Sequence, residues 1–245
     1  MPKVIKYFPE SKNVQACFAD KSWGNLSFKW PGEKVLEHRQ KLFASLNLNL
    51  NKLVMPEQVH GKIIKVITND LQGRGALKND WLEGVEGLVT KAPGIVLGAE
   101  ASDCLLIYAF DPKAQVIGIV HAGWRGVKNN AVVALFDKML DQGAEVGNIE
   151  VAIGPHIQQC CFEVQSDVVE QFQDYPDSIK IEQGKHYINL ADIVKRQLII
   201  RNVDLINIKI SERCTCCELN FHSFRREKQS CDGGMLGLIW LMDKS

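Results

Sequence analysis

The most informative pattern in the sequence is Leu105–Gly126, LLIYAFDPKAQVIGIVHAGWRG. Two apolar runs, 105–110 and 116–120, predict buried β-strands, and the Asp-Pro pair between them predicts a turn that joins neighbouring strands. The second run ends at His121, and the next residues are small except for a tryptophan and an arginine. The same stretch therefore predicts part of a sheet and a polar site at its end.

Apolar periodicity predicts further elements on both sides of this pair of strands. We expect helices over 34–46, 129–141, 166–172 and 189–201, and strands over 63–67, 87–90, 95–99, 150–153, 206–210 and 236–241. Several strands follow one another through turns, which predicts an α+β fold of mixed sheets flanked by helices. The turn-rich stretch 68–80 predicts a surface loop, and without repeats or linkers we expect one domain over residues 1–245.

Composition excludes several classes of function. Lysine plus arginine and aspartate plus glutamate both number 29, so net charge gives no reason to bind nucleic acid or an anionic membrane. There is no apolar run long enough to span a bilayer, and the N-terminal residues lack the apolar core of a signal peptide. We therefore expect a cytoplasmic protein whose eight cysteines are reduced.

The residues after the strand at 116–120 are suited to binding a small anion. Arg125 stands between Trp124 and a glycine at the predicted start of a helix, where backbone donors would add to its guanidinium. An alternative is that His121 makes a hydrogen bond in the core and Arg125 a surface salt bridge. Local spacing leaves both interpretations open.

Two histidines and a cysteine form the strongest candidate metal site. His60, Cys104 and His121 each stand near the end of an apolar run, where polar side chains can reach a common cleft. Zinc takes imidazole nitrogen and thiolate, and a catalytic zinc site keeps three protein ligands and one open position. Cys104 could instead be a nucleophile paired with His121, or an inert buried thiol. Asp103 could orient a ligand or relay a proton.

A second group of cysteines gives a weaker signal. Cys214-Thr-Cys-Cys217, with His222 and Cys231 downstream, could form a structural metal site, but it lacks the usual paired spacing. Adjacent residues of an extended chain point in opposite directions, so Cys160 and Cys161 are not expected to share a ligand. The interpretation as buried thiols is favoured for both groups.

Five motifs in order resemble one family along the chain from about residue 25 to 239. They are QVHG, SDC before an apolar strand, HAGWRG, IGPHIQQCCFEV, and a late CT followed by FHSFRR. This order resembles the YfiH-type laccase-domain proteins, first described as multicopper polyphenol oxidases and now regarded as purine nucleoside phosphorylases. HAGWRG is the most specific of the five motifs.

The resemblance implies a single-domain fold of mixed sheets and a zinc site formed by His60, Cys104 and His121, with copper as the alternative metal. It implies phosphorolysis of adenosine, inosine and S-methyl-5′-thioadenosine to the free base and the (methylthio)ribose 1-phosphate, with adenosine deamination. The partners would be purine nucleosides and phosphate, and the chain a monomer or a homodimer.

Candidate roles follow for the remaining polar residues. Arg125 would hold phosphate, and charge stabilisation of this kind is commonly a large catalytic contribution. Gln58, Trp124 and Arg226 are candidate substrate contacts, although the pair Arg225-Arg226 could equally be a solvated surface. The sequence also departs from the family pattern: Gly233-Gly234 stands where the family has Gly-Arg, and 19–27 lacks the usual Thr-Arg. The loss of an arginine removes one anion contact.

Two other functions stay open. A copper enzyme that oxidises phenols would also use two histidines and a cysteine, but a multicopper centre needs more histidines than the six present, none of them in an H-x-H pair. A metal-free thiol hydrolase would use Cys104 and His121 as its catalytic pair. A purely structural metal is disfavoured because three ligands leave one position open.

Overall fold

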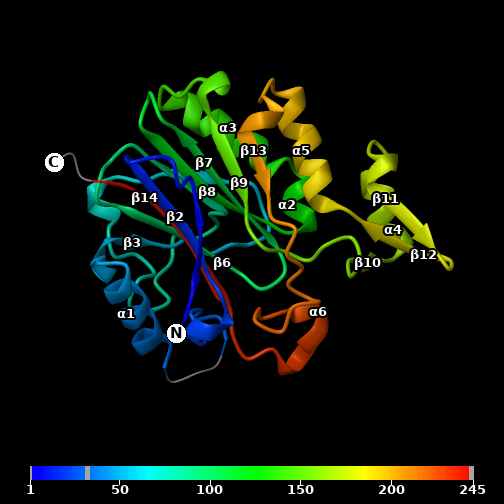
Figure 1. Ribbon diagram of the computed structural model, residues 1–245, viewed down its shortest axis with the longest axis horizontal. Helices are drawn as coiled ribbons and strands as arrows, with labels where there is room; N and C mark the ends of the chain where they lie inside the picture. Colours follow the sequence, from blue (N-terminus) through cyan, green and yellow to red (C-terminus); the bar gives the residue numbers. More distant parts are fainter. Residues whose placement is uncertain (1, 31–33, 243–245) are drawn as a thin grey trace.

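The stretch around Leu105–Gly126 forms the centre of a six-stranded sheet in the computed structural model, which describes residues 2–30 and 34–242 (Figure 1). This sheet has the order β13 (Ile208–Ile210), β9 (Glu150–Ile153), β7 (Leu105–Asp111), β8 (Val116–Ala122), β5 (Gly87–Thr90) and β4 (Ile64–Val66). β7 and β8 pair antiparallel along their length, as the turn between them predicted.

A second, five-stranded sheet packs against the first. Its order is β1 (Val4–Tyr7), β2 (Val14–Ala19), β14 (Met235–Leu241), β6 (Val96–Ala101) and β3 (Leu53–Val54). A smaller sheet of β10 (Glu163–Val164), β12 (Lys185–Ile188) and β11 (Ile179–Glu182) projects from the body (Figure 1). The helices are α1 (Val35–Ser45), α2 (Trp124–Lys128), α3 (Ala131–Asp141), α4 (Ser166–Val169), α5 (Leu190–Ile200) and α6 (Phe224–Glu227).

Strand alternation divides the core into layers. Along β7, Ile107 and Ala109 face a cluster that includes α3 and α5, whereas Tyr108 and Phe110 face the five-stranded sheet. The other face of the five-stranded sheet is covered by α1, through residues such as Phe43. Both central sheets are therefore buried on both faces, which explains why their strands are nearly continuous apolar runs. The predicted α+β class with mixed sheets flanked by helices is confirmed.

Most predicted elements form within a residue or two of their expected ends, and the differences have local causes. The helix expected from 129 begins at Ala131 because Asn130 adopts a left-handed conformation, with φ of 58°, that separates α2 from α3. The helix expected over 166–172 tightens after Val169 into a 3-10 turn. The central strand β2 was not predicted, since its alanines and cysteine have weak strand preference.

No helix among the described residues has the length and apolar character needed to cross a membrane.

Candidate metal centre

The register of the six-stranded sheet brings Cys104, His121 and Glu86 together. Cys104 precedes β7, and the antiparallel pairing places it beside the end of β8 that carries His121. β5 pairs with the other edge of β8, so Glu86, which precedes β5, lies next to His121 as well. The backbone N–H of His121 donates to the Glu86 carbonyl at 3.2 Å. Sheet pairing thus assembles residues that are far apart in sequence.

His60 reaches the same place from the loop between β3 and β4. Both Gln58 and His60 have φ of 61°, in the left-handed region that non-glycine residues rarely adopt. Two contacts hold the loop there: the Gly61 N–H donates to Glu86 Oε2 at 2.8 Å, and the Gln58 side chain pairs with the backbone of Glu100 at 2.6 and 2.8 Å. Backbone strain of this kind is typical of functional sites.

The three candidate ligand atoms lie within 4.8 Å of one another. The rings of His60 and His121 have centroids 5.0 Å apart. His121 Nδ1 lies 2.5 Å from Glu86 Oε1, which leaves Nε2 to face the site. A Cβ atom at Gly123 would stand 2.8 Å from His60 Nδ1 and 3.0 Å from Cys104 Sγ. Glycine at this position therefore keeps open the space between two of the three ligands.

The electrostatics of the two imidazoles differ. Burial lowers the pKa of His60, and the neighbouring His121 lowers it further, so His60 is held neutral. Burial alone would also lower the pKa of His121, but its interactions with Cys104 and Glu86 outweigh burial and raise that pKa to about 9. A cation at the site would compete with the His121 proton for the same negative groups.

The residues present fit a single zinc ion. Two imidazoles and a thiolate form a ligand set that zinc accepts, and three protein ligands leave a position open for a reactant. Glu86 accepts a hydrogen bond from the second ring nitrogen of a candidate ligand imidazole, as carboxylates do in many zinc centres. The sequence did not single out Glu86; its only signal is its position just before a buried strand.

The centre opens into a cavity of about 460 Å³. Seven of the eight predicted site residues line this cavity: Gln58, His60, Asp103, Cys104, His121, Trp124 and Arg125. Several further lining side chains that were not predicted are aromatic or basic: Lys29, Trp30, Phe162, Phe224 and Arg225. A cavity of this size with a few convergent polar groups is typical of a small-molecule site.

Arg125 is placed to bind an anion at this cavity. Its guanidinium stacks on the Trp124 ring at 4.2 Å, and the side chain is exposed. Within residues 2–30 and 34–242 it makes no ion pair, so its charge is available to a ligand. The Trp124 ring fixes the direction of the guanidinium at the same time.

Asp103 and the two arginines of the FHSFRR motif have other partners. Asp103 accepts hydrogen bonds from the Thr215 hydroxyl at 2.6 Å and the Arg225 N–H at 2.7 Å, and it is Glu86 that contacts a ligand histidine. The Arg226 guanidinium donates to the carbonyls of Thr215 and Cys216 and does not line the cavity. Arg225 lines it instead.

A buried ion pair supports the part of the cavity wall that includes Ser27, Gln58 and Glu100. Arg39 Nη2 lies 2.8 Å from Glu100 Oε1, and both side chains are almost fully buried. Ser27 Oγ donates to the other Glu100 oxygen at 2.7 Å. Through Gln58, which bonds the Glu100 backbone, this network reaches the loop that carries His60. The sequence placed Arg39 in a helix but gave no sign that it pointed inward.

The sequence is similar to a known protein family and to named relatives. A family model described as multi-copper polyphenol oxidoreductase laccase matches residues 23–242. The chain is 36% identical to adenosine deaminase RL5 from an unknown prokaryotic organism, over 79% of this chain and 77% of that one. It is 34% identical to purine nucleoside phosphorylase YlmD of Geobacillus stearothermophilus, over 84% of this chain and 78% of the relative.

A crystal structure of the hypothetical protein YfiH from Bacillus licheniformis superimposes with a TM-score of 0.92 at 26% identity, covering 98% of this chain and 97% of that one. The fold is therefore shared over nearly the whole length. The family model spans most of the sequence and includes each predicted metal ligand. This chain belongs to the family described as multi-copper polyphenol oxidoreductase laccase.

Proposed function

We propose that this protein is a zinc-dependent purine nucleoside enzyme. It would convert adenosine, inosine and S-methyl-5′-thioadenosine with phosphate to the free base and the ribose or methylthioribose 1-phosphate, and it would also deaminate adenosine. The observation that carries the proposal is the group of His60, Cys104 and His121 at a cavity that also presents Arg125. The names of the two relatives, a phosphorylase and a deaminase, support it.

The cavity offers separate surfaces for the base and for phosphate. Trp30 and Phe224 line it with ring centroids 6.2 Å apart, and flat rings of this kind pack against a purine. Arg125 would bind phosphate through its guanidinium, which matches the oxygens of an oxyanion. A nucleoside held between these groups would place its ribose near the metal centre.

In phosphorolysis, a phosphate oxygen forms a bond to ribose C1′ while the bond from C1′ to the base nitrogen breaks, and the base leaves with a proton. Arg125 would hold the phosphate and neutralise part of its charge. Glu86 would keep His121 in one orientation and one tautomer. A bound zinc ion would supply Lewis-acid chemistry and lower the pKa of water for deamination.

The test is incubation of the purified, zinc-loaded protein with adenosine, with and without phosphate, followed by chromatography of the products. We expect adenine and ribose 1-phosphate when phosphate is present, and inosine without it. The His60→Ala variant should lose both activities. If zinc-loaded protein yields neither the free base nor inosine, the proposal is wrong.

Oxidation of phenols by a bound copper ion is the second candidate function, because the family description names it and the centre has a set of two histidines and a cysteine. Oxygen consumption with a phenol, compared between copper-loaded and metal-free protein, decides it. A thiol mechanism rests on the contact between Cys104 and His121. It predicts activity that survives chelation and ends when Cys104 is alkylated, the opposite of a zinc enzyme.

A further inference from the structure

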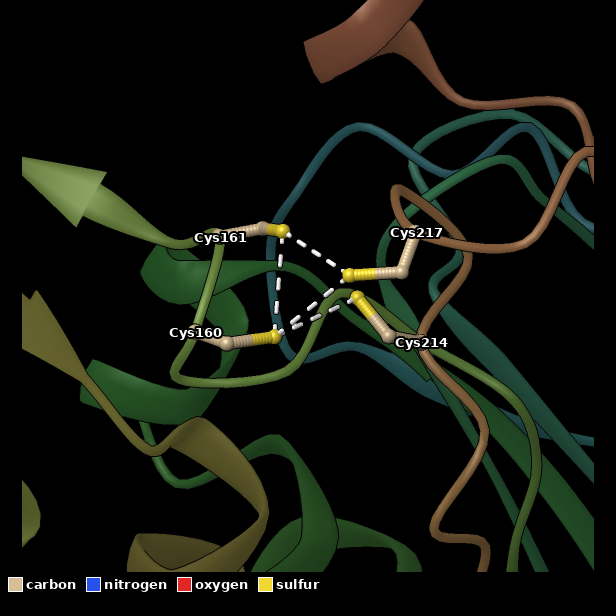
Figure 2. A group of neighbouring side chains, drawn as sticks. All are labelled: Cys160, Cys161, Cys214 and Cys217. Atoms are coloured by element: carbon tan, nitrogen blue, oxygen red, sulfur yellow. Dashed lines mark hydrogen bonds between the residues drawn. The ribbon is translucent and has the colours of Figure 1, made fainter.

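Four cysteines outside the candidate active centre converge on one point. Cys160 and Cys161 lie in the turn between β9 and β10, and Cys214 and Cys217 lie in the loop that follows β13. Their sulfur atoms lie within 4.8 Å of one another. Figure 2 shows that the four sulfurs point toward a common centre from two separate segments.

The local backbone explains why two adjacent cysteines face the same way, against the expectation for an extended chain. The chain is not extended here, because the N–H groups of Cys161 and Phe162 both donate to the Gln158 carbonyl at 3.0 Å and close a tight turn. An isolated parallel bridge between His156 and Cys214 then aligns the second segment beside this turn. The tertiary contact therefore builds a four-cysteine group that neither segment indicates alone.

The spacing of the sulfurs fits one tetrahedral ion. Sulfur–sulfur distances from Cys160 are 3.7 Å to Cys161, 3.8 Å to Cys214 and 3.7 Å to Cys217, and Cys161 to Cys217 is 3.3 Å. Thiolates bound to zinc at about 2.3 Å in a tetrahedron stand about 3.8 Å apart. A disulfide needs about 2.05 Å, and these cysteines are free.

A backbone donor also points at the group. Cys214 Sγ accepts a hydrogen bond from the Gln158 N–H at 3.4 Å. Such a donor stabilises the negative charge that a thiolate ligand carries. A divalent ion would displace the thiol protons, as thiolate ligation requires.

We propose that Cys160, Cys161, Cys214 and Cys217 bind one Zn²⁺ in a closed structural site. Four protein ligands leave no open position, which distinguishes this site from the three-ligand centre. The proposal depends neither on the three-ligand centre nor on the activity proposed for it.

The position of the site gives it a structural role. It joins two segments that both contact the wall of the cavity: Arg225 donates to the carbonyls of Cys161 and Glu163 at 2.9 and 2.8 Å, and Thr215 donates to Asp103 at 2.6 Å. Phe162, next to Cys161, lines the cavity itself. A metal ion that links these segments would therefore hold one wall of the cavity in place.

The test uses protein in which His60→Ala and His121→Ala remove the first centre, so that its metal does not enter the measurement. We expect zinc bound after purification under reducing conditions, and a loss of one zinc ion per chain when Cys160→Ser or Cys217→Ser is added. Cys216→Ser is the matched control, because Cys216 lies in the same loop but outside the group, and it should keep the zinc. Equal zinc content with and without Cys217→Ser contradicts the proposal.

Two further measurements do not depend on whether the cysteine variants fold. Cobalt added to the metal-free protein should give the visible spectrum of a tetrahedral tetrathiolate centre, which is absent if the proposal is wrong. In the protein that carries His60→Ala and His121→Ala, zinc should protect Cys160 and Cys217, which are both exposed, from a thiol reagent. Zinc should also raise the Tm of this protein. Unchanged reactivity, or an iron ion in place of zinc in protein purified without added metal, overturns the assignment.

Discussion

His121 Nδ1 lies 2.5 Å from Oε1 of Glu86, and both side chains are buried. The other Glu86 oxygen accepts the Gly61 N–H at 2.8 Å, so one carboxylate orients a ligand on β8 and anchors the loop of His60. We expect Glu86→Gln to weaken zinc binding by about 10- to 100-fold, the usual effect of removing such a partner. Competition with a chromogenic chelator measures this affinity.

Glu57→Gln is the control for Glu86→Gln. Glu57 lies in the same region and accepts the Gly84 N–H at 2.7 Å, but it contacts none of the three ligands. Its substitution should leave the zinc affinity within about twofold, as expected for a carboxylate that does not contact a ligand. Equal losses in the two variants would show that Glu86 acts on the fold rather than on the metal.

Gly123→Ala should disrupt the centre through sterics alone. The added Cβ would lie 2.8 Å from His60 Nδ1, closer than real Cβ contacts, and 3.0 Å from Cys104 Sγ, tighter than most such contacts. We expect a loss of one zinc ion per chain, that of the three-ligand centre, measured by elemental analysis against the wild type, with little change in secondary structure. Gly147→Ala is the matched control, since nothing lies within 4 Å of its Cβ position. Normal zinc content in Gly123→Ala would place the metal elsewhere.

Arg125→Ala should affect phosphorolysis more than deamination. An exposed guanidinium without an ion pair in the described part of the chain is free to bind phosphate, and we expect KM for phosphate to rise by at least about tenfold, as for the loss of one charge-assisted contact. Steady-state kinetics at varied phosphate measure it. Lys128→Ala is the control, because Lys128 lies on the same helix and its amine donates a hydrogen bond to the Gln171 carbonyl. An unchanged KM would show that another group binds phosphate.

Arg39→Ala should destabilise the protein strongly. It would leave the Glu100 carboxylate, 6% exposed, without the guanidinium that pairs with it, at a cost of about 3–5 kcal/mol in the free energy of unfolding. Urea denaturation measures the change. Arg39→Met combined with Glu100→Leu should recover part of it, since no unpaired charge remains. Lys41→Ala, in an exposed pair on the same helix, should change little.

Glu227 predicts a dependence of stability on pH. Burial would raise its pKa, but hydrogen bonds from Arg226 and Lys21 outweigh burial and lower that pKa from 4.5 to about 2. Because the pKa is lower in the folded state, Glu227 stabilises the fold above pH 4.5 and this contribution disappears as pH falls toward 2.

We expect Glu227→Gln to lower the free energy of unfolding by about 1–2 kcal/mol at pH 7, after allowance for solvent screening. The difference from the wild type should shrink toward zero near pH 2, as the native carboxylate becomes protonated. Urea denaturation of both proteins at several pH values measures it, and effects shared by both, such as metal loss in acid, cancel in the difference. A constant difference across this range would contradict the assignment.

The strands and helices with strong apolar periodicity could be predicted from the sequence. The runs around His121 are long and apolar because both faces of their sheets are buried, and such runs are visible without coordinates. The candidate ligands His60, Cys104 and His121 could also be named, since imidazole and thiol side chains at the ends of apolar runs are chemically conspicuous.

The residues that support these candidate ligands became visible only in the three-dimensional structure. Glu86 contacts His121 through the register of β5 and β8, and Arg39 reaches Glu100 from a helix whose inward face the sequence did not show. The four cysteines meet because a turn at Gln158 and a bridge to a distant loop bring them together. Such contacts depend on strand pairing between segments far apart in the chain, and local sequence patterns carry no record of that pairing.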